Sequence, residues 1–168
     1  YLMIAPFVVL FAAFFLYPIL SGFYYSFHDW NGVEVPRFVG LRSAETACRA
    51  GPSQAHPVAI TYMRAGAPML VVAETTDHWR KLRDIDGAEC WVRQAALRAP
   101  SHAIVLEEAT LHAQRDSASA ARARLAPGVM ARVERVEGDW TRLSADGLSG
   151  WARTRLLWGV SGDIALHN

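Results

Sequence analysis

The first 27 positions of the chain contain no charged residue, and their apolar character is continuous rather than periodic. A run of about 20 apolar residues can cross a bilayer as a helix. The aromatic residues that close the run, the last of them Trp30, are typical of a membrane interface. We therefore expect a transmembrane helix over residues 1–28. The alternative is a secretory signal peptide, whose apolar region is shorter, about 7–15 residues, and which carries a basic head and a small-residue cleavage site.

Beyond residue 41 the pattern changes to short apolar–polar alternations separated by turn residues, which predicts β-strands. We expect strands at six segments: 69–73, 79–83, 89–92, 130–136, 140–143 and 150–152. Asp86-Gly87 and Asp146-Gly147 are strong hairpin turn signals. The stretch 117–124, with the sequence SASAARAR, predicts a short helical turn or a solvated loop without a function of its own.

Two windows of the alternating part repeat each other, residues 77–97 and residues 138–157. Each contains a Trp, a basic–apolar pair, an Asp-Gly turn, a second Trp and a terminal Leu. Short strands at regular spacing with turns between them are typical of small barrels. The fold class predicted for the chain is therefore all-β, with two small β-barrels in tandem after an N-terminal transmembrane α-helix.

Composition and charge exclude several classes of function. The net charge is +1, so there is no electrostatic footprint for nucleic acid. The six His residues are scattered without the spacing of metal ligands, and no glycine-rich phosphate loop is present. We therefore predict no metal, no cofactor and no nucleic-acid partner. The expected contact with a membrane is made by residues 1–27.

Residues 1–41 resemble the first transmembrane helix and following loop of sugar-type ABC transporter permeases. The resemblance is carried by APF, LYPIL, YYSFHDWNG and PRFVGL, in that order. It implies a helix that runs outward, with the rest of the chain outside the cytoplasm. The alternative function that it implies is a fragment of a carbohydrate permease fused to an incidental tail. A second apolar run and the family's Glu-Ala-Ala coupling loop are missing from the sequence.

Residues 37–160 resemble tandem bacterial SH3-like (SH3b) domain proteins of the alphaproteobacterial type. The matching residues are CRAGPSQAHPV at 48–58, RAGAP at 64–68, WRKLRDIDG at 79–87 and WV at 91–92. The resemblance implies SH3-like barrels at 42–98 and 99–160, a junction at 29–41 and a tail at 161–168. It also implies a non-catalytic binding module that contacts cell-wall peptide or glycan, or a partner protein. The expected location is the inner membrane, with the barrels in the periplasm.

Cys48 and Cys90 both depart from the residues usual in SH3-like relatives, an aliphatic residue and a glycine. In such a barrel their strands are expected to lie close together, and we interpret the pair as a disulfide. Two buried free thiols are the alternative. A disulfide implies an oxidising compartment. A nucleophilic cysteine would require a histidine partner, and His56 and His78 lie in the same repeat. SH3-like domains do no catalysis themselves, so the resemblance implies that the chain is not an enzyme.

Aromatic residues are the candidate ligand contacts. Trp91 and Trp151 are expected in the core or half-buried, whereas Trp79 and Trp140 begin strands beside polar turns and are expected to be partly exposed. Exposed aromatic side chains on a small barrel suit stacking on glycan or docking of peptide. The candidate groove consists of Tyr62, Asp77, Trp79, Arg80 and Trp91, and Trp140 is a further candidate ligand contact. Structural packing is the alternative role of the groove residues.

Overall fold

The computed structural model describes residues 37–160 together with Phe11, Phe14, Phe15, Tyr17 and Ile19. The chain divides after Gly32, and the second unit, Val33–Asn168, contains all the β-structure described below. The predicted transmembrane helix over 1–28 falls almost entirely outside the described residues. No helix within the described part of the chain has the length and hydropathy needed to cross a membrane.

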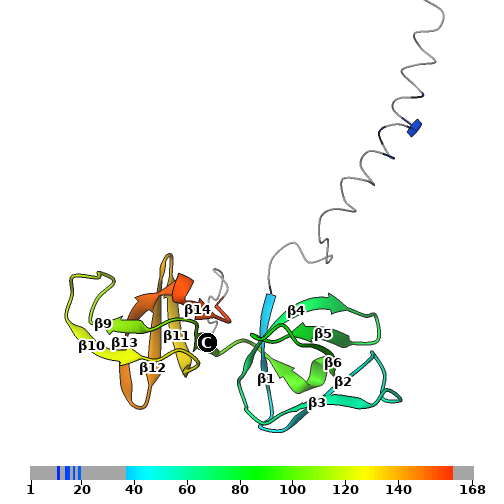
Figure 1. Cartoon of the computed structure of the whole chain (residues 1–168), viewed down its shortest axis with the longest axis horizontal. Helices are drawn as coiled ribbons and strands as arrows, with labels where there is room; N and C mark the ends of the chain where they lie inside the picture. The colour runs from blue at the N-terminus through cyan, green and yellow to red at the C-terminus, as the bar shows by residue number, and fades with distance from the viewer. Residues whose placement is uncertain (1–10, 12–13, 16, 18, 20–36, 161–168) are drawn as a thin grey trace, which may run out of the picture. The chain divides into compact units, whose positions relative to one another are not determined.

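The first barrel is built on a seven-stranded antiparallel sheet of order β3-β2-β6-β5-β4-β1-β7 (Figure 1). Its strands are β1 (Arg37–Leu41), β2 (Thr46–Arg49), β3 (Val58–Tyr62), β4 (Pro68–Glu74), β5 (Trp79–Arg83), β6 (Glu89–Arg93) and β7 (Leu97–Arg98). A 3-10 turn at Gln94–Ala96 links β6 to β7. Strand β1 lies within the junction predicted over 29–41. It belongs to the barrel because it pairs with β4 and β7, and Val39, Gly40 and Leu41 are buried.

The second barrel has a seven-stranded sheet of order β10-β9-β13-β12-β11-β8-β14. Its strands are β8 (His102–Val105), β9 (Ala109–His112), β10 (Ala121–Leu125), β11 (Met130–Glu137), β12 (Trp140–Ala145), β13 (Leu148–Arg153) and β14 (Leu157–Trp158). The prediction of a helical turn or loop over 117–124 is wrong for its second half. Ala121 to Arg124 belong to β10, because the small residues Ala121 and Ala123 allow the chain to pair with β9.

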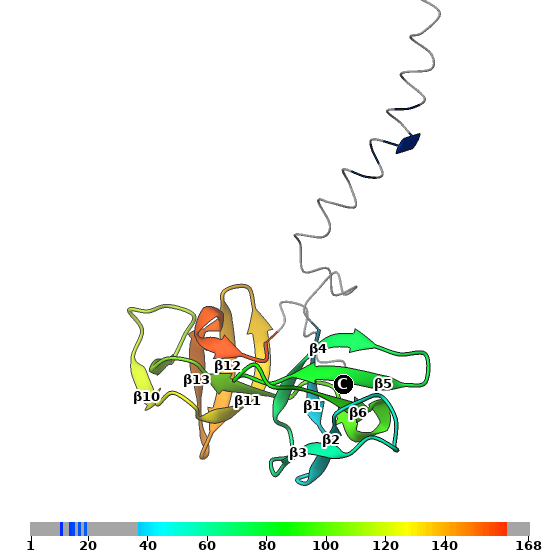
Figure 2. The same cartoon turned by 45° about the vertical axis from the view of Figure 1, so that its right-hand side comes forward.

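The two sheets have the same strand order, β8 to β14 repeating β1 to β7. Figures 1 and 2 show the two barrels from two directions. The all-β tandem repeat predicted from the sequence is therefore confirmed. The register between strands also shows which positions of the first barrel are equivalent to which positions of the second. Leu82 lies opposite Cys90 on β5–β6, and Leu143 lies opposite Gly150 on β12–β13. Gly150 is thus the equivalent of Cys90, and Leu111 on β9 is the equivalent of Cys48 on β2.

Each barrel encloses its own apolar core, formed by residues that alternate along the strands. Alternation places every second side chain on the same face of a strand, so the inward positions of several strands meet. The first core contains Val39, Leu41, Cys48, Ala67, Met69, Val71, Leu82, Cys90, Val92 and Leu97. The second contains Ala103, Val105, Ala109, Leu111, Leu125, Ala131, Val133, Leu143, Ala152 and Leu157.

The two Asp-Gly signals form hairpins, as predicted, but of different kinds. Ala145 pairs with Leu148, which leaves a two-residue turn in which Asp146 and Gly147 have φ values of 50° and 80°. Two positive φ values are the conformation that asparagine, aspartate and glycine favour in such turns. In the first barrel Arg83 pairs with Glu89, so the connection is longer and is organised by Asp84, whose Oδ1 accepts the backbone N–H groups of Asp86 and Ala88.

Candidate binding surface

The outer face of β5 and β6 carries two tryptophans as diagonal neighbours. Trp79 pairs with Arg93 and Lys81 pairs with Trp91, so alternation places these four side chains on the same face. Trp91 is half-buried, whereas Trp79 is only 5% exposed. The Arg93 guanidinium lies 5.4 Å from the centroid of the Trp79 ring and covers it. Trp91 is therefore the tryptophan of this barrel that offers a ring surface to a ligand.

Basic groups lie on both sides of Trp91. Arg49 on β2 pairs with Trp91 on one side, and Lys81 on β5 pairs with it on the other. Both side chains are already engaged, because Arg49 Nη1 donates to the backbone oxygen of His56 at 2.7 Å and the Lys81 ammonium forms an ion pair with Glu89. Hydrogen bonds from Lys81 and Arg83 lower the pKa of the Glu89 carboxyl below its usual range, so the pair stays charged at neutral pH.

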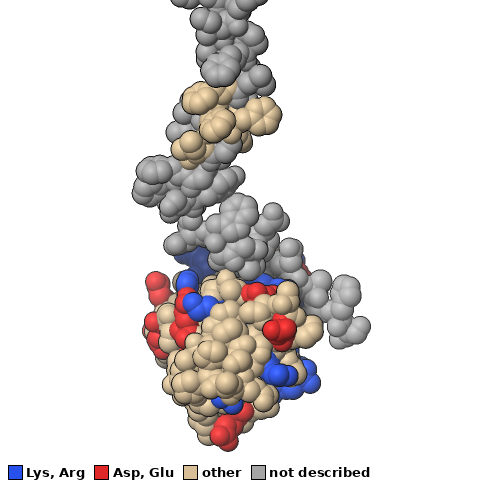
Figure 3. Space-filling model, turned by 90° about the vertical axis from the view of Figure 1, so that its right-hand side faces the viewer, with Lys and Arg blue, Asp and Glu red and all other residues tan. Residues whose placement is uncertain are grey.

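The loop after β2, residues 50–57, is held against Arg49. Ser53 Oγ lies 2.7 Å from His56 Nδ1, and the imidazole lies where a Cβ on Gly51 would come within 2.5 Å of it. Only glycine leaves that space free. The loop contains no Asp, Glu, Lys or Arg. Figure 3 looks onto the right-hand side of Figure 1, and charged side chains surround an uncharged centre on that face.

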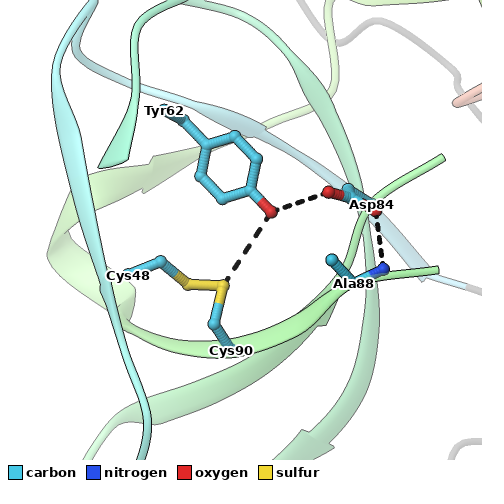
Figure 4. The surroundings of a disulfide bond; sticks show 5 residues. All are labelled: Cys48, Tyr62, Asp84, Ala88 and Cys90. Atoms are coloured by element: carbon cyan, nitrogen blue, oxygen red, sulfur yellow. Dashed lines mark hydrogen bonds between the residues drawn. A yellow bond between two sulfur atoms is a disulfide. The ribbon is translucent and has the colours of Figure 1, made fainter. Parts of the chain in front are cut away.

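Cys48 and Cys90 form a disulfide with a Cα–Cα distance of 5.5 Å, as the sequence interpretation predicted (Figure 4). Tyr62 packs beside it. The Tyr62 hydroxyl donates to Asp84 Oδ2 at 2.9 Å and lies 3.9 Å from Cys90 Sγ, which has no proton to donate in a disulfide. Burial and the hydrogen bond to Asp84 raise the pKa of the Tyr62 phenol above its usual value. Tyr62 therefore packs on the disulfide, in a role separate from the Trp91 face.

The six candidate residues do not form one groove. Asp77 is exposed in the turn between β4 and β5. Arg80 pairs with Val92, on the opposite face from Trp79, and its guanidinium lies 3.5 Å from Glu74. Tyr62 contacts the disulfide, and Trp140 lies in the second barrel. The strand pairing keeps these side chains on different faces, since neighbouring positions along a strand alternate.

The expectation that Trp79 and Trp140 are partly exposed is wrong. Trp140 is 8% exposed, with the Arg153 guanidinium 4.2 Å from its ring centroid and the His112 ring at 5.9 Å in an edge-on contact. An arginine on the neighbouring strand covers each tryptophan. This contact depends on which residues pair across the two strands, so the sequence around each tryptophan does not show it. Trp91 and Trp151 are half-buried, in agreement with the expectation for them.

Sequence reasoning missed the cations that surround the tryptophans. Arg93 and Arg153 follow Trp91 and Trp151 by two positions, and this Trp-x-Arg spacing is identical in both repeats. The shared spacing is the signal that could have found them. Their actual partners are Trp79 and Trp140, on the adjacent strand, so the pairing needed the register as well. In the second barrel Arg115 lies 5.6 Å from the Trp151 centroid.

Two barrels of one strand order, each with a Trp–Arg outer face, define a tandem β-barrel module. The chain belongs to the bacterial SH3 domain family, whose model matches residues 42–99 and again 107–159, together more than half of the chain. The first match begins after the permease-like segment, so the resemblance of residues 1–41 to permeases stays a prediction.

Solved structures with some similarity include NlpC2 from Trichomonas vaginalis, at 11% identity and a TM-score of 0.33, with 78% of this chain and 52% of that chain covered. An NlpC/P60 family protein from Bacillus cereus has 8% identity and a TM-score of 0.33, with 71% and 55% covered. The chain thus spans about half the length of these two structures. Likeness at this level carries no argument about activity. No curated protein matches the chain.

Proposed function

We propose that the chain is a non-catalytic binding module whose first barrel contacts cell-wall peptide or glycan through the face around Trp91. The observation that carries the proposal is the half-exposed Trp91 ring, which lies between Arg49 and Lys81 and beside the folded, uncharged loop at 50–57. A flat aromatic surface with polar groups at its edges suits a sugar ring or a peptide plane. Membership of the bacterial SH3 domain family supports a binding role.

An oxidising location outside the cytoplasm is part of this proposal. The Cys48–Cys90 disulfide supports it, because such bonds persist in the periplasm and are reduced in the cytosol. Attachment to the inner membrane through residues 1–28 remains a prediction from the sequence. Alkylation of the unreduced, denatured chain taken from cells, followed by mass analysis, tests the location. Two reactive thiols would contradict it. Denaturation is needed because Cys48 and Cys90 are buried in the folded chain.

The binding proposal is tested by co-sedimentation of the full chain, in mild detergent, with purified peptidoglycan sacculi. We expect the chain in the pellet, and Trp91→Ala to weaken its retention several-fold because the stacking surface is lost. Trp151→Ala, the equivalent change in the second barrel, is the matched control and should weaken retention less. Trp79→Ala is unsuitable as a probe because the Trp79 side chain is buried and its removal disturbs packing.

A structural scaffold is the second candidate function, and the burial of Trp79 and Trp140 favours it. If the barrels serve only as spacers, their aromatic residues need only to pack. The same sedimentation separates the two functions. Absence of the wild-type chain from the pellet at tens of micromolar would reject wall binding in this form and leave the scaffold, or a protein partner, as the better explanation.

A further inference from the structure

Strand β3 forms one edge of the first sheet, and among the described residues it pairs only with β2. An edge strand presents unpaired backbone N–H and C=O groups that can bind another strand. Natural proteins usually protect such edges with charged side chains, bulges or a covering segment. The edge of β3 has no charge to protect it, since no Asp, Glu, Lys or Arg occurs from Ala50 to Met63.

The side chains along β3 are apolar or small on both faces. Ile60 and Tyr62 pack against the core but stay partly uncovered, because no strand of the described part of the chain lies beyond them. Val58 is 46% exposed, and Met63, directly after the strand, is 71% exposed. A strand added at this edge would bury more of these side chains and satisfy the free backbone groups at the same time.

The equivalent edge of the second barrel is protected. Strand register makes Thr61 the equivalent of Arg124, because Ala47 on β2 matches Thr110 on β9. Ala59 is likewise the equivalent of Arg122. Both arginines are exposed on β10. A bulge interrupts the pairing of both edge strands at the equivalent place, between Val58 and Ile60 on β3 and between Ala121 and Ala123 on β10, so the two edges differ in charge and not in regularity. The same fold thus has one charged edge and one neutral edge in a single chain.

We propose that β3 is the place where two copies of this chain associate, by antiparallel pairing of β3 with β3. In a two-fold contact each copy presents the same residues, so an edge whose charges all have one sign would meet an edge of the same sign and be repelled. A neutral edge is therefore complementary to itself, and it offers no ion pair to a charged partner. A contact of one short strand per copy is small, so the association is weak and depends on concentration.

Oxidative cross-linking of the full chain in mild detergent tests the proposal. Single cysteines are introduced on β3 as Ala59→Cys or Thr61→Cys, and at the matched positions on β10 as Arg122→Cys or Arg124→Cys. We expect covalent dimers several-fold more often from at least one of the β3 variants than from its β10 counterpart. Association through residues 1–32 would raise all four variants alike. Circular dichroism, with mapping of the Cys48–Cys90 bond, checks that each variant folds.

Charged residues introduced on β3 make the test more specific. Adding both Ala59→Arg and Met63→Arg to the Thr61→Cys variant should remove the dimer, because antiparallel pairing that brings the two copies of position 61 together places position 59 of one copy opposite position 63 of the other. Equal cross-linking from β3 and β10, or a dimer that persists in this triple variant, would overturn the proposal. Binding of a neutral extended peptide to β3 in a chain that gives no cross-linked dimer would also overturn it, in favour of a peptide as the occupant of the edge. The sedimentation test at Trp91 is independent of these outcomes.

Discussion

The two barrels have the same strand order, but different chemistry holds their second and sixth strands together. In the first barrel Cys48 on β2 is bonded to Cys90 on β6. In the second barrel the equivalent positions are Leu111 and Gly150, and a Cβ added to Gly150 would lie 2.8 Å from the Leu111 Cβ. A small residue therefore lets a large one fill the space where the first barrel has a covalent bond. One fold accepts two solutions to the same contact.

The largest expected difference between the barrels follows from removing the disulfide. Closing the loop between residues 48 and 90, a separation of 42, stabilises the first barrel by about 4 kcal/mol in the chain-entropy model. Reduction should therefore destabilise the first barrel and leave the second unchanged. Hydrogen exchange, measured separately for β2–β6 and β9–β13, checks this. Equal loss of protection in both barrels would show that their stabilities are coupled.

In the second barrel the Leu111–Gly150 contact takes the place of the disulfide, and a substitution can disrupt it. Gly150→Ala would force the new methyl group into the Leu111 side chain and cost about 1–3 kcal/mol, as overpacking usually does. Denaturant unfolding, followed through exchange in β9–β13, measures the change. Leu111→Ala in the same chain should not recover the loss, because alanine keeps the Cβ that the new methyl group would meet at 2.8 Å and the backbone oxygen of His112 stays at 3.0 Å. If Gly150→Ala has no effect on its own, the close packing described here is wrong.

Tyr62 should make the stability of the first barrel depend on pH in a way that the second does not share. It is the only tyrosine after residue 25, and its equivalent in the second barrel is Leu125. Its pKa is raised in the folded state, so the folded barrel retains the proton. The stability it contributes is complete below the unfolded pKa of about 10 and falls as the pH rises above that value. Tyr62→Phe should cost about 1 kcal/mol at neutral pH by losing the hydrogen bond to Asp84.

Unfolding measured from pH 8 to 11 tests the alkaline part of this prediction. Wild type should lose stability in the first barrel over the upper part of that range, whereas Tyr62→Phe should show a flatter profile. An identical slope in wild type and variant would mean that folding does not raise the pKa of Tyr62.

The smallest expected difference concerns the arginines over Trp79 and Trp140. Arg153 lies 4.2 Å from its ring centroid and Arg93 lies 5.4 Å from its own. Cation–π contacts at partly exposed sites are worth about 0.5–1 kcal/mol and weaken with distance. Arg153→Gln should therefore destabilise the second barrel slightly more than Arg93→Gln destabilises the first. Thermal melts of the two variants, compared with Arg64→Gln as an exposed control, check the order.

Local pattern was enough to predict the repeat and the central strands, whereas the disulfide was predicted through the resemblance to SH3-like barrels. The Asp-Gly turns and the alternation around Trp79 and Trp140 depend on neighbouring residues, so the sequence contains them directly. The exposure of the candidate residues could not be predicted in the same way, because the exposure of a side chain depends on the residues of the neighbouring strand. Arg93 covers Trp79 only through the β5–β6 register, which no single window contains. Strand β10 was missed because alanine is depleted in strands, a preference that pairing with β9 overrides here.

The position of the disulfide also decides how far the chain can be stretched. A force that pulls on the two ends of the chain passes from Cys48 to Cys90 through the sulfur atoms, so the residues between them carry no tension. With a separation of 42 residues, about 140 Å of extended chain is withheld from unravelling. The second barrel has no such bond and can be drawn out over its whole length. Most of the first barrel is thus shielded from extension, whereas the second barrel is not.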